Sequence, residues 1–145
     1  MDVASPAPKL QLNDRVRTFL AEPNYATLAT AGADGEPHQA VIWFRFDGAG
    51  SVLVNSRAGR RWPTELQADR RCSLAVTDRH DPFKWVGLQA VVESVVDDVE
   101  VAREDIVALS VHYDDFSDAG AARFRSQPRI SFRLRILGVH DHLDE

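Results

Sequence analysis

Three short stretches of alternating apolar and polar residues, separated by two glycine-rich turns, constrain this chain's fold more than any other feature. The stretches are Tyr25–Thr30, His38–Phe46 and Ser51–Asn55. The turns between them, Gly32–Pro37 and Asp47–Gly50, are rich in residues that tolerate left-handed or fixed backbone angles. Connections this short join antiparallel neighbours, so the pattern predicts an antiparallel meander.

Further strands are expected at Cys72–Thr77 and at Trp85–Val96, the second with a bend near Gly87. The last strand is predicted over Arg129–Ile136, and it extends past a kink at Gly138 to residues 139–143. Its apolar positions alternate with Arg129, Ser131, Arg133 and Arg135. This alternation predicts a half-buried strand with an arginine-rich outer face.

Helices are predicted between these strands. Asn13 or Asp14 caps the first, which runs to Ala21, and a second covers Pro63–Ala68 with proline in its first turn. Asp97 or Asp98 caps a third that ends near His112. The apolar positions of this third helix are Val101, Ile106, Leu109 and Val111. Residues 113–128 form a polar segment with one helical turn near 121–124.

About six antiparallel strands with a few flanking helices predict a mostly β protein, a small closed barrel. Its 145 residues suit one domain, which we place at residues 12–145. Residues 1–11 contain two prolines and no apolar periodicity, and we expect a flexible N-terminal arm there.

The net charge of −5 disfavours a general role in nucleic-acid binding, which usually needs a basic face. No apolar run reaches the length of a membrane span and no secretory leader is visible, so we expect a cytoplasmic protein without membrane contact. The single cysteine, Cys72, excludes an intrachain disulfide and is expected to be a small core residue.

The most informative polar stretch runs from Val54 to Pro63. It joins the end of a strand to a helix start and contains Asn55, Ser56, Arg57, Gly59, Arg60, Arg61 and Trp62. Backbone N–H groups at a helix start and guanidinium forks both bind phosphate well. The stretch therefore predicts a small-anion site, with Trp62 placed to flank a planar ligand. An ordinary charged surface loop is the alternative.

No other pattern indicates a catalytic or metal site. The chain lacks the glycine-containing nucleophile, P-loop and dinucleotide motifs, so we predict no catalytic side chain. His140 and His142 share one face of a strand, but no familiar zinc spacing surrounds them, and no metal is predicted.

Several motifs occur in a recognisable order. Tyr25–Thr30 is followed by Asp34-Gly35-Glu36-Pro37-His38, then by Val54-Asn55-Ser56, Gly59–Pro63 and Asp69-Arg70-Arg71-Cys72. This order resembles the pyridoxamine 5'-phosphate oxidase-like split β-barrel superfamily. Within it, the chain is similar to the B group of flavin/deazaflavin oxidoreductases, which use coenzyme F-420. The similarity is good over residues 12–96 and looser beyond them.

The resemblance implies a six-stranded antiparallel split β-barrel of the FMN-binding type, in a homodimer with two cofactor sites between the subunits. It places the cofactor phosphate at Asn55, Ser56, Gly59, Arg60 and Arg61, and the ring system along His38, Ala40 and Val41. Trp85 matches a position that approaches the cofactor from the barrel wall. Many relatives carry lysine at the position of Trp62, and the chain end lacks the ending of the true oxidase. Pyridoxamine phosphate oxidation is therefore not expected.

These expectations amount to an F-420-dependent oxidoreductase that transfers hydride to a small unsaturated or conjugated substrate. An FMN-dependent enzyme of the same fold is the nearest alternative, followed by a non-catalytic carrier of flavin or F-420. The proton that accompanies the hydride has three candidate sources at this point, namely solvent, His38 and Tyr113.

Overall fold

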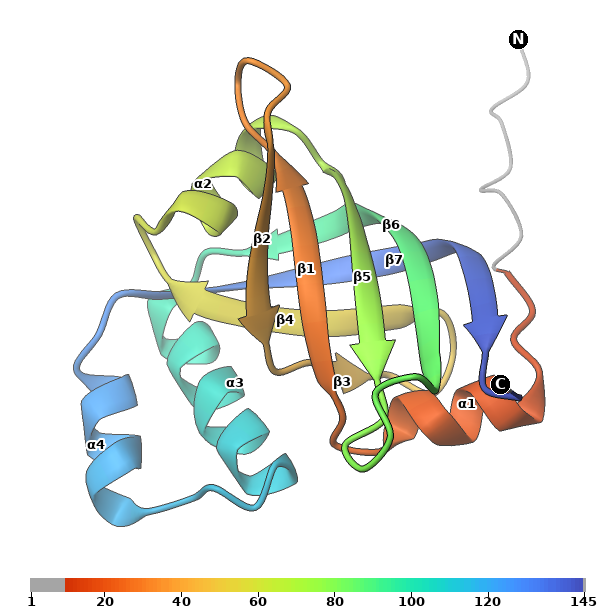
Figure 1. Ribbon diagram of the computed structural model, residues 1–145. Helices are drawn as coiled ribbons and strands as arrows, with labels where there is room; N and C mark the ends of the chain where they lie inside the picture. Colours follow the sequence, from red (N-terminus) through yellow and green to blue (C-terminus); the bar gives the residue numbers. More distant parts are fainter. Residues whose placement is uncertain (1–9, 145) are drawn as a thin grey trace, which may run out of the picture.

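The computed structural model describes residues 10–144 and shows one curled antiparallel sheet with four flanking helices in that range (Figure 1). The arm expected at residues 1–11 lies almost wholly outside the described residues. The helices are α1 (Asp14–Ala21), α2 (Arg61–Ala68), α3 (Val99–His112) and α4 (Asp118–Arg125). The strands are β1 (Tyr25–Ala31), β2 (Pro37–Ile42), β3 (Arg45–Phe46), β4 (Ser51–Arg57), β5 (Arg71–Thr77), β6 (Trp85–Val96) and β7 (Arg129–His142).

The seven strands form a single sheet in the order β2-β1-β5-β6-β7-β4-β3. The long strands β6 and β7 pair over most of their length and curl, so that β4 and β7 cross behind β2, β1 and β5 (Figure 1). This is the predicted split β-barrel, with seven strands where six were expected. β7 runs unbroken through Gly138, although its register with β6 shifts between Gln89 and Ala90.

The extra strand arises because the stretch predicted as His38–Phe46 breaks in the middle. β2 pairs with β1 at one edge of the sheet, whereas β3 pairs with β4 at the other edge. Between them the buried Phe44 donates its backbone N–H to the hydroxyl of Tyr113 (3.0 Å) instead of to a strand. The predicted three-strand meander is therefore wrong. Strands β1 to β4 form two hairpins, β1–β2 and β3–β4, on opposite edges of the sheet.

Local signals set the element ends. Asn13 caps α1 and Asp98 caps α3, and each was one of the two residues predicted for that cap. The turn before β4 needs Gly48, which has φ +80°, and the Asp47 carboxylate accepts three backbone N–H bonds there. α4 spans eight residues, where one turn was expected, and Ser117 caps its start.

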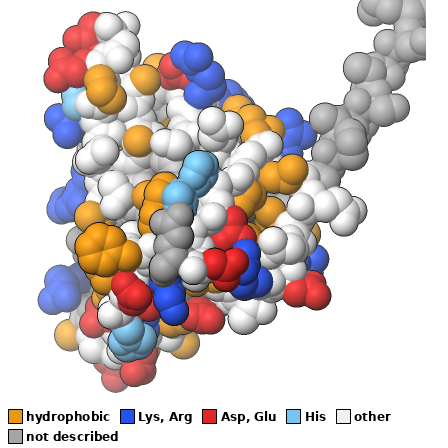
Figure 2. All heavy atoms as spheres, turned by 45° about the vertical axis from the view of Figure 1, so that its right-hand side comes forward, with side chains coloured by type: hydrophobic (Ala, Val, Ile, Leu, Met, Phe, Trp, Pro, Cys, Tyr) orange, Lys and Arg blue, Asp and Glu red, His pale blue; other side chains and the backbone are white. Residues whose placement is uncertain are grey.

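The helices close the open sides of the sheet. α1 lies near the C-terminal end, where Arg15 pairs with Asp141 and Asp144. Acidic and basic side chains are interspersed on the face turned forward in Figure 2. α3 and α4 pack against each other beside β4 and β7 (Figure 1). Of the four predicted apolar positions of α3, Ile106 and Leu109 are buried, but Val101 and Val111 are about half exposed.

The core fills the concave side of the sheet. Its fully buried members come from every long strand and include Leu28, Val54, Val76, Phe132 and Leu134. No helix among residues 10–144 has the length and apolar character needed to span a bilayer.

Candidate functional site

The loop that joins β4 to α2 presents a helix start flanked by arginines. Gly59 adopts φ +90°, a left-handed conformation that glycine adopts at little cost, and the loop is fixed where Ala58 donates its N–H to the Pro128 carbonyl (2.7 Å). Arg60 is the N-cap of α2, but its side chain makes no capping bond. N–H groups of the first helical turn therefore remain available to an anion.

The helix begins at Arg61, two residues earlier than predicted, and this brings several predicted residues around one hollow. The hollow has a volume of about 330 Å³. Its lining comes from β2 and from the start of α2, and comprises His38, Gln39, Ala40, Arg60, Arg61 and Trp62. Five of these six residues were predicted cofactor contacts. We call this set the β2–α2 hollow.

The two arginines of this hollow differ in their surroundings. Arg61 lies one helical turn before Glu65, with Nε 3.8 Å from a carboxylate oxygen. Within residues 10–144, no carboxylate forms an ion pair with Arg60. Arg60 therefore carries more of the net positive charge that the hollow offers to a ligand.

A second hollow of about 250 Å³ lies on the other side of Arg60 and Trp62, both of which line it. Its remaining lining is largely apolar and aromatic and includes Val41, Trp43 and Asn55. Val41 is 74% exposed, the second most exposed large apolar side chain of the described residues after Phe83. The predicted residues thus line two adjoining hollows separated by Arg60 and Trp62.

Val54, Ser56 and Pro63 are buried beneath these hollows rather than in them. Asn55 is also buried, and its amide group is fully engaged. It donates to the Ala102 carbonyl and to Ser131 Oγ, both at 2.8 Å. Its Oδ1 accepts from Nε and Nη2 of Arg129, at 3.0 and 2.8 Å. Asn55 therefore has no free amide group to offer a ligand, and its hydrogen bonds fix the position of Arg129.

Arg129 is a buried cation that the sequence pattern placed on the exposed outer face of its strand. That placement is wrong for Arg129 and Ser131, which are 8% and 0% exposed, because α3 and α4 cover this end of the face. Arg133, farther along, is exposed as expected. The pairing of β4 with β7 shows what the sequence pattern does not, namely that Arg129 lies directly opposite Arg57.

The charge of Arg129 has no acidic counterpart in the described part of the chain. Its third hydrogen-bonding nitrogen donates to the neutral Gln127 side chain (2.9 Å), and its guanidinium lies over the Phe124 ring. Burial, and secondarily the nearby charges of Arg60 and Arg57, lowers the pKa of Arg129 to about 10. Three guanidinium groups thus share one region with uncompensated charge, which suits a bound phosphate.

Glu65 is a further residue that sequence reasoning missed. His38 Nδ1 lies 2.6 and 3.0 Å from its two carboxylate oxygens, and Thr30 donates its hydroxyl to the same carboxylate (3.1 Å). The Glu65 side chain is only 10% exposed. In the sequence it resembles an ordinary polar helix position, and nothing in its spacing shows that it faces β2.

A family model described as pyridoxamine 5'-phosphate oxidase matches residues 12–142. The chain belongs to this family. Among sequence relatives, a pyridoxine/pyridoxamine 5'-phosphate oxidase from Cupriavidus metallidurans is 33% identical over 96 residues, which are 64% of this chain and 42% of that protein. The matched part of this chain thus spans less than half the length of that oxidase.

Two further similar proteins are matched over a larger share of their own length. An F420H(2)-dependent biliverdin reductase from Mycobacterium tuberculosis is 34% identical over 95 residues, which are 63% of this chain and 67% of that protein. A solved structure described as an F420 reductase superposes with a TM-score of 0.75 at 22% identity, covering 86% of this chain and 94% of that one. At this identity the superposition establishes the split-barrel fold alone.

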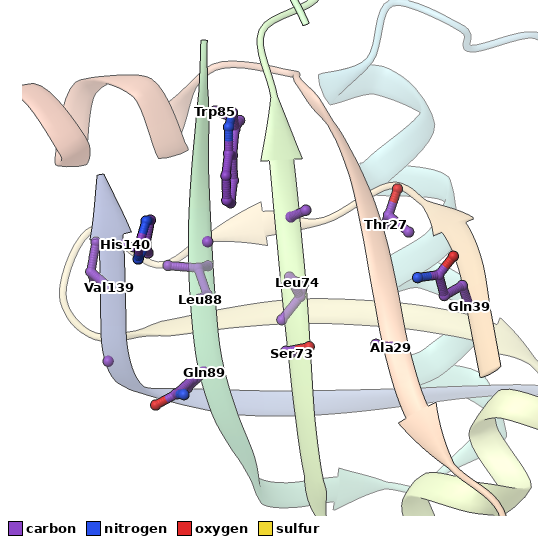
Figure 3. Close-up of a pocket in the computed structure, with 13 residues that line it drawn as sticks. Thr27, Ala29, Gln39, Ser73, Leu74, Trp85, Leu88, Gln89, Val139 and His140 are labelled. Carbon is purple, nitrogen blue, oxygen red and sulfur yellow. The ribbon is translucent and has the colours of Figure 1, made fainter. Parts of the chain in front are cut away.

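In this member of the oxidase family, Trp85 lies apart from both hollows. It lines a third hollow of about 410 Å³ formed by strands β1, β2, β5, β6 and β7 (Figure 3). Its ring stacks on His142 with centroids 4.3 Å apart, and His140 completes the stack. The lining side chains, among them Thr27 and Ser73, alternate with core residues, so this hollow is on the outer face of the sheet. The proposed cofactor contact of Trp85 stays a prediction.

Tyr113, a candidate proton source, has a structural role. It is 5% exposed, and its hydroxyl donates to the Asn24 carbonyl (2.6 Å) while accepting from Phe44. Burial raises its pKa to about 12. The hydroxyl therefore holds the crossing between β2 and β3, and it does not face either hollow.

We expect Tyr113→Phe to destabilise the protein by about 1–3 kcal/mol, because buried backbone groups of Asn24 and Phe44 lose their partner. Urea unfolding measures this loss. Tyr25→Phe is the matched control, since Tyr25 is 45% exposed and the change should cost less than about 0.5 kcal/mol. Equal stability of both variants would contradict the assignment.

Cys72 packs against the core, as predicted, and is half-buried. Burial, and secondarily the charge of Asp69, raises the pKa of its thiol to about 12. Since only the thiolate is alkylated, iodoacetamide at pH 8 should react about a thousandfold more slowly than with an exposed thiol. Mass spectrometry follows the reaction, and unfolding in urea should restore normal reactivity. Fast alkylation of the folded protein would show that the thiol is accessible.

Proposed function

We propose that this protein is an oxidoreductase that binds coenzyme F-420 and reduces a small unsaturated or conjugated substrate. The observation that carries the proposal is the uncompensated cluster of Arg57, Arg60 and Arg129 beside the open start of α2. A structural surface loop has no need of a buried guanidinium without a carboxylate, because burying unpaired charge is costly. A phosphate-bearing cofactor supplies the missing negative charge.

The choice of F-420 rests on the comparison with the biliverdin reductase, which is named for that cofactor and of which the chain covers two thirds. When bound, reduced F-420 would supply a hydride. The protein's own residues then have simple tasks. Arg60 and the α2 start hold the phosphate, Trp62 borders the planar part, and His38 and Ala40 of β2 line its path.

FMN is the alternative cofactor, because the same cluster would hold its phosphate and the family model is that of a pyridoxamine 5'-phosphate oxidase. A side-by-side titration of the purified protein with F-420, FMN and FAD separates the two. We expect submicromolar binding of F-420 and no comparable binding of FMN. Tight FMN binding, or a yellow protein from a host without F-420, would favour the flavin enzyme instead.

F-420 binding without turnover of any quinone, enone or tetrapyrrole would indicate a carrier.

We further propose a homodimer that packs through the outer face of the sheet. Small side chains border the third hollow on that face, and Leu137 nearby is half exposed. A partner seated there would bring Trp85 of one subunit toward the cofactor of the other. Light scattering on the purified protein should give twice the mass of the chain, whereas a monomer would remove Trp85 from the cofactor site.

A further inference from the structure

Reduction of a conjugated double bond consumes a proton as well as a hydride. The structure removes Tyr113 from the candidate sources, because its hydroxyl is held by backbone groups of Asn24 and Phe44. His38 lines the β2–α2 hollow and is 21% exposed at its side chain, so its ring is reachable from that hollow.

The ring of His38 has a fixed orientation. Its Nδ1 lies within hydrogen-bond distance of both oxygens of Glu65, and Glu65 is held in turn by Thr30. A carboxylate is an acceptor, so Nδ1 must carry a hydrogen. Nε2 is then the nitrogen through which the ring can transfer a proton.

The surroundings of Nε2 leave it able to transfer a proton. Its nearest acidic neighbour is Glu36, 3.7 Å away and 65% exposed, which is too far for a hydrogen bond. The charged groups that face the ring are Asp34 and Glu36 of the β1–β2 turn, and Arg60, Arg61 and Glu65 of α2.

We propose that His38 is the catalytic acid that protonates the reduced substrate, and that Glu65 is its positioning residue. This inference rests on the proposed function. A bound reduced cofactor would supply the hydride for a C–H bond at the electron-poor carbon and would itself be oxidised, while the π-electron pair of the substrate would move to the far end of the conjugated system. There the pair would take the proton from Nε2 of the protonated ring, and the N–H electron pair would stay on the ring. Solvent would then reprotonate His38.

The experiment compares His38→Gln, Glu65→Gln and the control Glu36→Gln, which removes an exposed carboxylate from the same neighbourhood. Reduced F-420 and cyclohexenone are the probes. We expect His38→Gln to lower kcat by roughly 10²- to 10⁴-fold, the usual contribution of a general acid, with the F-420 dissociation constant within about threefold. Glu65→Gln should lower kcat by about tenfold or more, and Glu36→Gln should change neither value.

A second measurement needs neither turnover nor cofactor. Nitrogen-15 NMR of the imidazole should show the Nδ1–H form in the cofactor-free protein, and a mixture of both forms in Glu65→Gln.

A third experiment tests the role of His38 by rescue of activity. Added imidazole should restore part of the activity of His38→Ala, which a purely structural role of His38 would not allow.

The outcomes separate this inference from the function on which it rests. If the wild-type protein binds no F-420 or reduces no enone, the proposed function fails, and the inference fails with it. If the wild type is active and His38→Gln is equally fast, only the inference is overturned. A weakened F-420 affinity with unchanged kcat would make His38 a phosphate contact, which also overturns it.

Discussion

Replacing both Arg60 and Arg61 with alanine should abolish cofactor binding and leave the fold intact. Each charged hydrogen bond to a phosphate contributes roughly 1.5–3 kcal/mol, which corresponds to about 10- to 150-fold in affinity. The fold should survive because the Arg60 side chain makes no capping bond and Arg61 is exposed at the helix start. Isothermal titration with F-420 measures the loss.

The single variants Arg60→Ala and Arg61→Ala should differ in their affinity for F-420, although the sequence alone does not distinguish the two arginines. Arg60→Ala should account for most of the loss, because Arg60 forms no ion pair within the described range. Arg61→Ala should cost only a few-fold, since Glu65 already offsets part of its charge.

Arg71→Ala is the matched control for these variants. Arg71 is exposed, pairs with Asp69 and does not line either hollow beside α2, so its removal should not change the affinity for F-420. Undiminished binding by the double variant, with normal circular dichroism, would refute the phosphate site. Equal effects of the two single changes would show that Glu65 does not distinguish the arginines.

The sequence predicted elements well where the determining signals are local. Caps, alternation and turn residues act within a few positions, and so α1, β1, β4 and α3 fall close to their expected bounds. The break between β2 and β3 was missed because its cause is distant. The bond from Phe44 to the Tyr113 hydroxyl joins residues 69 positions apart.

The candidate site divides in the same way. Arg60, Arg61 and Trp62 could be predicted because strand, turn and helix start follow one another in the chain. Arg129 and Glu65 could not. The alternation around Arg129 is the same whether its outer face meets solvent or helices α3 and α4, and only the tertiary packing decides between these cases.

The role of Arg129 leads to the second large expected effect, that of Asn55→Ala. This change removes the Oδ1 that accepts two N–H groups of a buried guanidinium, and it leaves the Ala102 carbonyl and Ser131 without their donor. An unsatisfied buried charged donor costs more than a neutral one, so we expect a loss of about 3 kcal/mol. Urea unfolding measures it, with Ser126→Ala, an exposed change, as the control.

A second substitution separates stability from binding. Asn55→Ala combined with Arg129→Met replaces both partners with apolar groups and removes the unpaired charge, so it should recover most of the lost stability. It should not recover F-420 affinity, because the buried member of the cationic cluster is gone. If the double variant instead binds F-420 as tightly as the wild type, Arg129 serves only the packing beneath α3. The positive charge offered to the phosphate would then come from Arg57 and Arg60 alone.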